Sequence, residues 1–251
     1  MRLLLAIALV LGLLSPGIAR PVRPHAPATT FVWTGVYAAT PAGGIVQGNP
    51  QAPVKLVEYY SPSCPHCKHF IDDARVGLST MIVSGKLSYE TRPLLLPHPH
   101  DPALDVLIRC GTPQQGAALT EAFFAEQDNI YARLEPVFKA NVARWKALTI
   151  TAAYTDIADK LGLVALAQQA GVSLSRAQAC LGDKRNYDAL QAISNTANQL
   201  KVDQTPSFFL NGAALPTTPT EAPWVSVKRV LDVTLSGVTW PPKSSQKKGS
   251  S

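Results

Sequence analysis

A cysteine pair, Cys64 and Cys67, directly follows an apolar run at residues 54–60 that has the composition of a buried strand. Beyond the pair, apolar residues recur every three or four positions, which predicts a helix from the motif to about residue 84. With two residues between them at a helix start, both sulfur atoms lie on one side of the first turn and can close a small disulfide ring. Because a helix N-terminus also stabilises a thiolate, the pattern predicts a redox-active dithiol.

The N-terminus has the pattern of a secretory signal peptide over residues 1–19. Arg2 precedes an apolar run, and small residues up to Ala19 provide a cleavage site. An uncleaved membrane anchor is the alternative, but the run is short for a spanning helix, which needs about 20 residues. We therefore expect export to an oxidising compartment, where disulfides persist.

The chain is basic, with a formal net charge of +6, and much of the excess lies close to the C-terminus. No basic stripe interleaved with aromatic residues is visible, so nucleic acid is not an expected partner. Residues 20–36 are interpreted as an extension before the folded domain, and residues 239–251 as a disordered tail.

Two further cysteines, Cys110 and Cys180, complete a set of four, which allows three pairings. The short spacing of Cys64 and Cys67 favours one scheme, in which these two pair and Cys110 pairs with Cys180. The second pair is interpreted as a structural disulfide, which contributes roughly 4 kcal/mol when it closes so long a loop. A second redox-active pair is the alternative.

The order of the predicted elements indicates an α/β fold. An edge strand at residues 45–47, the buried strand, the redox helix and a strand at 87–91 are followed by helices, a hairpin around Asn211-Gly212 and a last helix. This order predicts a thioredoxin-like domain at residues 37–100 and 201–238, with an inserted helical domain at 101–200. Asp101 and Thr112, each before a proline, are predicted helix caps inside the insertion.

The redox chemistry gives the residues of the motif different roles. Cys64, at the helix start, is the predicted nucleophile, and Cys67, one turn further in, is the predicted resolving thiol. His66 can donate a hydrogen bond to the thiolate or place positive charge near it. A metal site at Cys64, His66, Cys67 and His69 is the alternative, but ligands confined to one helical turn cannot surround zinc tetrahedrally.

Residues outside the motif are predicted to complete the site. Glu58 lies within the apolar strand, where a charge is costly unless it is wet or paired, and is interpreted as a buried acid that relays the proton of Cys67. A strand-edge carboxylate paired with Lys55 or an arginine is the alternative. Thr205-Pro206 precedes a strand and is a candidate cis-proline, which would present a backbone edge to an extended peptide.

Two histidines, His98 and His100, alternate with prolines and at first sight suggest a metal site. Because the prolines place them in a loop, they are interpreted as surface loop residues instead. No metal or other cofactor is therefore expected.

The strand at 54–60, the C-P-H-C box at 64–67 and the T-P-S-F-F box at 205–209 together resemble the DsbA-like thiol:disulfide oxidoreductases of the bacterial periplasm. The resemblance covers about residues 40–236. It implies a thioredoxin domain with an inserted helical domain, and donation of disulfides to newly exported proteins.

The same resemblance implies roles for individual residues. Cys64 is the nucleophile, Cys67 its resolving partner, Pro206 the cis-proline and Glu58 the buried acid. Thr205 stands where the best-known oxidase of the family has valine, and this leaves open which protein reoxidises the site.

These observations predict an exported, periplasmic disulfide donor. Its partners would be reduced exported proteins, which we expect to contact Thr205 and Pro65, and a membrane or soluble protein that reoxidises Cys64–Cys67. A reductase or isomerase of the same fold is the closest alternative, and a metal-binding carrier is a more distant one. Isomerases commonly carry a separate dimerisation domain, and no such domain fits before residue 40. A monomer is expected.

Overall fold

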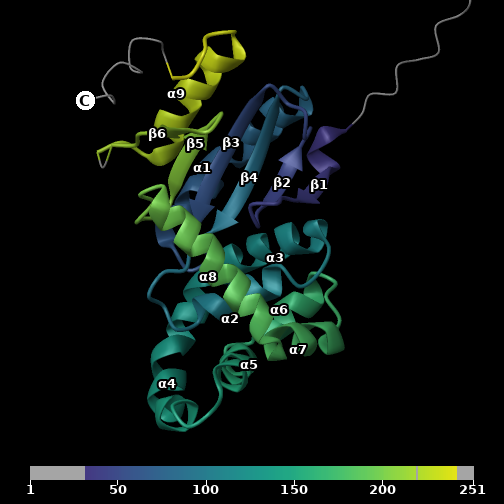
Figure 1. The fold of residues 1–251 in the computed structure, drawn as a ribbon, viewed down its shortest axis with the longest axis vertical. Helices are drawn as coiled ribbons and strands as arrows, with labels where there is room; N and C mark the ends of the chain where they lie inside the picture. Colours follow the sequence, from purple (N-terminus) through teal and green to yellow (C-terminus); the bar gives the residue numbers. More distant parts are fainter. Residues whose placement is uncertain (1–31, 219, 242–251) are drawn as a thin grey trace, which may run out of the picture. The chain divides into compact units, whose positions relative to one another are not determined.

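The computed structural model describes residues 32–218 and 220–241, in which a six-stranded mixed sheet has the order β1-β2-β4-β3-β5-β6 (Figure 1). The strands are β1 Tyr37–Ala39, β2 Ile45–Gly48, β3 Val54–Tyr60, β4 Leu87–Pro93, β5 Ser207–Leu210 and β6 Ala213–Leu215. The predicted signal peptide and most of the predicted tail lie outside the described residues.

Helices precede, interrupt and follow the sheet. The redox helix is α1 (Pro65–Val83), the last helix is α9 (Pro223–Leu235), and a short 3-10 helix, Trp33–Gly35, precedes β1. Between β4 and β5 the chain forms α2 Asp101–Ile108, α3 Pro113–Ala125, α4 Gln127–Trp145, α5 Ile150–Lys160, α6 Leu163–Gln169, α7 Leu174–Gly182 and α8 Lys184–Gln199. This order confirms the predicted thioredoxin-like α/β fold with a helical insertion.

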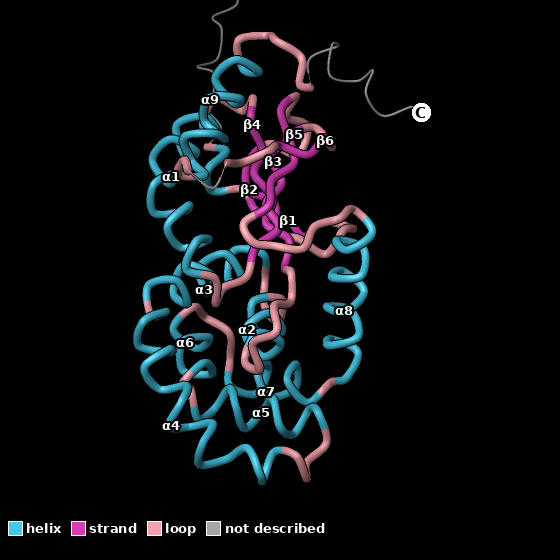
Figure 2. The backbone as a smooth tube through the Cα atoms, turned by 90° about the vertical axis from the view of Figure 1, so that its left-hand side faces the viewer, coloured by secondary structure: helices cyan, strands magenta, loops and turns pink. Residues whose placement is uncertain are grey.

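The predicted buried strand is β3, which lies inside the sheet, parallel to β4 and antiparallel to β5. Leu56 belongs to one apolar cluster with Phe70 of α1 and Leu231 of α9, whereas its neighbour Val57 clusters with Ala197 of α8. Figure 2 shows α1 and α9 on one side of the strands and α8 on the other. Burial on both faces explains why the run is apolar without alternation.

The Asn211-Gly212 turn joins β5 and β6, as the sequence predicts. Both residues have positive φ, 49° and 82°, the left-handed conformation that asparagine and glycine tolerate best. The Lys55 amide donates a hydrogen bond to the Asn211 side chain at 2.8 Å, and the Asn211 amide donates to the Lys55 carbonyl at 2.9 Å. These two hydrogen bonds hold the turn against the start of β3, the strand with which β5 pairs.

Residues 45–47 lie in β2, but β2 is not the edge strand that the sequence predicts. β1 pairs with it antiparallel on one side and β4 pairs with it on the other. β1 spans only three residues, too few to show the alternation by which a strand is found in a sequence.

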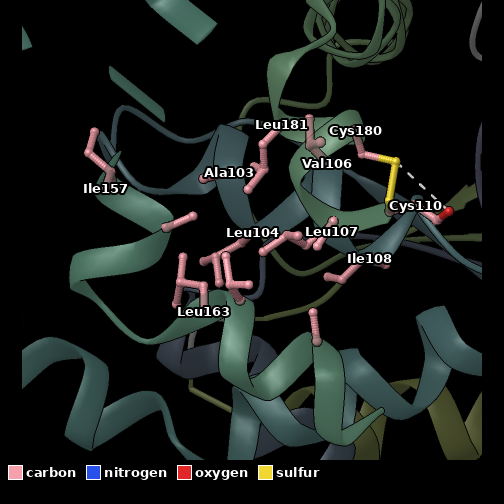
Figure 3. Close-up of a cluster of buried hydrophobic side chains, with 14 of the residues drawn as sticks. Ala103, Leu104, Val106, Leu107, Ile108, Cys110, Ile157, Leu163, Cys180 and Leu181 are labelled. Atoms are coloured by element: carbon pink, nitrogen blue, oxygen red, sulfur yellow. Dashed lines mark hydrogen bonds between the residues drawn. A yellow bond between two sulfur atoms is a disulfide. The ribbon is translucent and has the colours of Figure 1, made fainter. Parts of the chain in front are cut away.

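The inserted helices enclose a hydrophobic core of their own (Figure 3). Leu104 and Leu107 of α2 and Leu163 of α6 are among its fully buried residues. The predicted pair Cys110 and Cys180 forms a disulfide in this core and joins the end of α2 to α7 across 70 residues. Within the described residues, none of the helices combines the length and the apolar character needed to span a membrane.

Only one of the two predicted helix caps is present. The Thr112 side chain accepts a hydrogen bond from the Gln115 amide, and the Gln115 side chain accepts one from the Thr112 amide, which is a complete capping box for α3. Asp101 is instead the first residue of α2, and no side chain caps that helix. The Asp101 carboxylate accepts hydrogen bonds from other segments, described below, so it is not available to its own helix.

Replacing Cys110 and Cys180 by alanine is expected to lower the free energy of unfolding by about 4 kcal/mol, because the unfolded chain regains the entropy of a long open loop. Urea denaturation followed by circular dichroism measures the difference. Both proteins in the comparison carry Cys64→Ala and Cys67→Ala, so that they differ in a single disulfide. Equal free energies of unfolding would contradict a structural role for the Cys110–Cys180 bond.

Candidate active site

Cys64, the predicted nucleophile, is the N-cap residue of α1. Its backbone is extended, with φ −82° and ψ 118°, and Pro65 occupies the first helical position. Proline fits there because the first amides of a helix have no partner within the helix. The amides of His66 and Cys67 donate hydrogen bonds to the Cys64 sulfur, which is therefore aimed at the helix N-terminus.

The Cys64 thiol is strongly acidified. Its pKa falls to about 5, chiefly because the Cys67 thiol donates a hydrogen bond to the Cys64 sulfur. Burial opposes this shift, while Thr205 and the two amides of the first turn add to it. At pH 7 the main form of Cys64 is therefore the thiolate, which is the reactive form of cysteine.

Cys67 has the opposite character. It is 0% exposed, and burial raises the pKa of its thiol well above the ordinary value. The hydrogen bond with Cys64 and the charge of Glu58 raise this pKa further. Both cysteines are free thiols in the structure, which corresponds to the reduced member of the predicted cycle. The Cys64–Cys67 disulfide itself stays a prediction.

Glu58 is buried beneath the motif, with 2% of its surface exposed. Burial raises the pKa of its carboxyl to about 8, and the Tyr89 hydroxyl of β4 donates a hydrogen bond to it. Its carboxyl is also hydrogen-bonded to the Cys67 thiol. In the described part of the chain no lysine or arginine pairs with Glu58, and Lys55 is exposed. The alternative of a carboxylate paired with Lys55 or an arginine is therefore wrong.

Glu58 also borders a cavity of about 480 Å³ between the sheet, α1 and α3. The cavity wall includes Tyr60 and Tyr89 of the sheet, Arg75 of α1 and Phe124 of α3. A space of this size, lined partly by polar groups, is large enough for water. The buried carboxyl of Glu58 therefore borders a space that water can occupy.

The peptide bond between Thr205 and Pro206 is cis, as the sequence predicts. It immediately precedes β5, in which Ser207 pairs with Tyr59 near the end of β3. This pairing brings Thr205 next to Cys64, whose thiol donates a hydrogen bond to the Thr205 carbonyl at 3.4 Å. The buried Thr205 hydroxyl has no hydrogen-bond partner among the described residues while Cys64 is a thiol, and it is near enough to stabilise the thiolate.

The structure thus brings together Cys64, Cys67, Glu58, Thr205 and Pro206 at the end of β3. The disulfide between Cys110 and Cys180 lies elsewhere, in the core of the inserted helices.

Pro65 and His66 are exposed at the start of α1. The ring of His66 lies edge-on to that of His69, with 6.4 Å between their centroids. His66 bonds to the Cys64 sulfur through its amide, so the expected contact between its imidazole and the thiolate stays a prediction.

Sequence patterns did not point to the polar residues that surround the loop before Cys64. Ser61 donates a hydrogen bond to Asp101 at 2.9 Å, and the Ser63 hydroxyl lies 2.7 Å from Nδ1 of His98. These contacts join segments about 40 residues apart, which no local periodicity reveals. Two serines immediately before the motif were the one available signal.

His100 corrects the interpretation of the proline-rich segment as a surface loop. His98 is partly exposed, but His100 is buried, with its ring 6.0 Å from that of Tyr131 on α4. His100 is buried because α2 packs against the other inserted helices. The alternation of histidines with prolines does not predict this burial.

A family model described as thioredoxin matches residues 40–227. The match spans most of the chain, which therefore belongs to this family. Among solved structures, a protein-disulfide isomerase from Novosphingobium aromaticivorans is similar, with a TM-score of 0.69 and 29% identity over 77% of this chain and 97% of that one. α-DsbA1 from Wolbachia pipientis, with a TM-score of 0.55 and 20% identity over 75% and 88% of the two chains, shows that the fold is DsbA-like.

Curated relatives come from Rickettsia. A protein of Rickettsia bellii named as a protein-disulfide oxidoreductase is 25% identical over 170 residues, which are 67% of this chain and 57% of that protein. A protein of Rickettsia typhi with the same name is 25% identical over 190 residues, 75% of this chain and 62% of that protein. The chain thus matches only about three fifths of the length of these relatives.

The asymmetry of the two thiols can be measured directly. Thiolate absorbance at 240 nm is expected to rise with a midpoint near pH 5, the pKa of Cys64, and iodoacetamide at pH 6 is expected to modify Cys64 but not Cys67. The Cys64→Ser variant, which lacks the acidified thiol, serves as the control and should lose the absorbance step. A midpoint near the ordinary cysteine value of about 8.5 would contradict the geometry.

Glu58→Gln is expected to change how stability depends on pH. From the ordinary carboxyl pKa of 4.5 up to about 8, the unfolded chain has released this proton and the folded chain retains it, so the free energy of unfolding falls as the pH rises. The variant lacks this slope, which amounts to roughly 3 to 5 kcal/mol over the window.

The lowered pKa of Cys64 acts in the opposite sense over a similar range, so the informative quantity is the difference between the two proteins at each pH. Urea denaturation at pH 5 and at pH 8 provides it. A difference that is constant with pH would show that Glu58 is ionised in the folded protein.

Proposed function

We propose that this protein is an exported thiol:disulfide oxidoreductase that donates disulfide bonds to newly exported proteins. The observation that carries the proposal is the contrast between the two sulfurs. The pKa of Cys64 is about 5, whereas that of Cys67 lies well above its ordinary value. A stabilised thiolate favours the reduced pair, and the disulfide form is therefore a strong oxidant.

The reaction begins with the pair as a disulfide. A client thiolate attacks the sulfur of Cys64, the bond to Cys67 breaks, and Cys67 leaves as a thiolate that takes a proton from the neutral carboxyl of Glu58. A second client thiolate then attacks the client sulfur of the mixed disulfide and expels Cys64. Two electrons pass from the client to the enzyme, which ends as the Cys64 thiolate and the Cys67 thiol.

Three features support these steps. A low pKa makes Cys64 a good leaving group in the second step. Glu58, with a pKa of about 8 and a hydrogen bond to Cys67, can supply and recover the proton near neutral pH. The backbone before β5 lies beside Cys64, where an extended client segment can pair as an added strand, with Thr205 and the exposed Pro65 in contact with it.

The cycle also requires a second partner, which reoxidises the Cys64–Cys67 pair. A membrane or soluble protein that removes two electrons must restore the Cys64–Cys67 disulfide, and the periplasm is the compartment in which such chemistry would run. The protein would act there as a monomer, without a metal or other cofactor, after removal of residues 1–19. The thioredoxin-like domain would comprise residues 37–100 and 201–238, and the inserted helical domain residues 101–200.

A disulfide isomerase or reductase is the second candidate, favoured by the 29% identical structure whose name describes an isomerase. Equilibration with glutathione gives the reduction potential, and insulin reduction gives the rate in the reverse direction. A potential close to that of thioredoxin, about −270 mV, would exclude the disulfide donor and favour this candidate.

The Cys64→Ser variant tests the mechanism. Oxidation of a reduced peptide that carries two cysteines is expected to fall to the uncatalysed rate, because no mixed disulfide can form without the nucleophile. The matched double variant of Cys110 and Cys180 retains the motif and should retain the rate. Unchanged oxidation by Cys64→Ser would refute the mechanism.

A further inference from the structure

The two carbonyls that directly precede Cys64 accept hydrogen bonds from the inserted helices. The Gln127 side chain of α4 donates to the Pro62 carbonyl at 2.9 Å, and the Tyr131 hydroxyl of the same helix donates to the Ser63 carbonyl. Both residues of the loop are buried. The backbone just before the nucleophile is therefore held by side chains that lie 65 and 68 residues further along the chain.

The helix that supplies both donors is fixed to the core of the insertion. Gln127 is the first residue of α4 and Tyr131 lies one turn later, so their side chains share one side of the helix. The next turns of the same side carry Leu134 and Phe138, which pack against the core of the inserted helices. This core thus fixes the helix whose first turns hold the loop.

The two donors differ in how readily water can replace them. Gln127 is 3% exposed and the residue to which it donates is buried, so removal of its amide leaves the Pro62 carbonyl without a partner. Tyr131 is only partly buried, and a water molecule can take the place of its hydroxyl. Of the two donors, Gln127 therefore contributes more.

The Tyr131 hydroxyl lies in the electric field of the nucleophile. Burial raises the pKa of this hydroxyl, and the charges of Asp101 and Cys64 raise it further. The hydroxyl donates to the Ser63 carbonyl, in the residue next to Cys64. It is therefore close enough for its contact with the loop to affect a charge on the Cys64 sulfur.

A carbonyl oxygen carries a partial negative charge, which is unfavourable beside a thiolate. The hydrogen bonds from Gln127 and Tyr131 offset this charge at the two carbonyls before Cys64 and fix the direction in which they point. The thiol and the disulfide carry no charge on Cys64, so the same bonds affect these forms little. The two donors therefore favour the thiolate and, with it, the reduced pair.

We propose that Gln127 and Tyr131 are positioning residues, which stabilise the Cys64 thiolate through the two carbonyls that precede it. The inserted helices thereby set how strongly oxidising the Cys64–Cys67 disulfide is. The inference rests on the proposed function, because it concerns the same pair of thiols. The N-cap geometry of Cys64, which directs its sulfur to the first amides of α1, is the arrangement that the two bonds preserve.

The equilibrium with glutathione at pH 7 measures the effect, since two glutathione thiols reduce the Cys64–Cys67 disulfide and leave as glutathione disulfide. Gln127→Met keeps a side chain of similar length without a donor, and it is expected to shift the equilibrium about fivefold toward the enzyme disulfide. Tyr131→Phe removes only the hydroxyl and is expected to shift it about threefold. Tyr131→Phe keeps the proposal testable where Gln127→Met does not fold.

A second measurement separates stabilisation of the thiolate from a purely structural role. If the donors act on the thiolate, the midpoint of the 240 nm titration of the reduced protein rises with the logarithm of the equilibrium shift, by about 0.7 of a pH unit for a fivefold shift. A variant that merely loosens the fold lowers the free energy of unfolding and leaves this midpoint unchanged.

Two matched controls lie in the inserted helices, away from the loop. Tyr154→Phe removes the hydroxyl of a partly buried tyrosine whose ring stacks on that of Tyr187. Gln191→Met removes the amide of a glutamine on α8 that donates to Asn195 at 3.1 Å. Both variants should leave the equilibrium and the midpoint unchanged.

Unchanged equilibria in Gln127→Met and Tyr131→Phe, or a shift that the titration midpoint does not follow, would overturn the proposal. Oxidation of a reduced peptide keeps this outcome distinguishable from failure of the proposed function. A natural protein that leaves the peptide reduced, with both variants shifted, would refute the disulfide donor and support the role of α4. A natural protein that oxidises the peptide, with neither variant shifted, would do the reverse.

Discussion

The chemistry of the site depends on one hydrogen bond, which the Cys67 thiol donates to the Cys64 sulfur. Because of this bond, two identical side chains differ in protonation: Cys64 is a stabilised thiolate, whereas Cys67 keeps its proton. The division requires both sulfurs on the first turn of α1, with Cys64 at the amide end and Cys67 buried one turn further in. A stabilised reduced pair is what the proposed donation of disulfides requires.

The sheet brings the remaining groups to this pair. β3 places Glu58 beneath the motif and leads directly into the loop before Cys64, while β4 beside it supplies the Tyr89 hydroxyl. β5 pairs with the other edge of β3 and so brings Thr205 to the sulfur. The pairing register of these strands therefore determines the distances between the groups of the site.

The inserted helices take part in the site as well. Residues of α2, α4 and the segment before α2 bond to all three residues of the loop at 61–63. The insertion has its own core, closed by the Cys110–Cys180 disulfide, and therefore offers the loop a stable support. Burying the polar side chains around this loop is tolerable because they are hydrogen-bonded to one another, as between Ser61 and Asp101 and between Ser63 and His98.

The sequence by itself determined the local structure. The recurrence of apolar residues predicted α1, the apolar run predicted β3, and the Asn211-Gly212 turn predicted the hairpin, because each depends on neighbours along the chain. Tertiary structure alone decided that Glu58 pairs with Tyr89, that Asp101 serves the loop before Cys64 and that β2 lies inside the sheet. Those outcomes depend on which distant segments pack together. Once these segments are buried, their polar groups need hydrogen-bond partners, and the local sequence pattern does not reveal which partners these are.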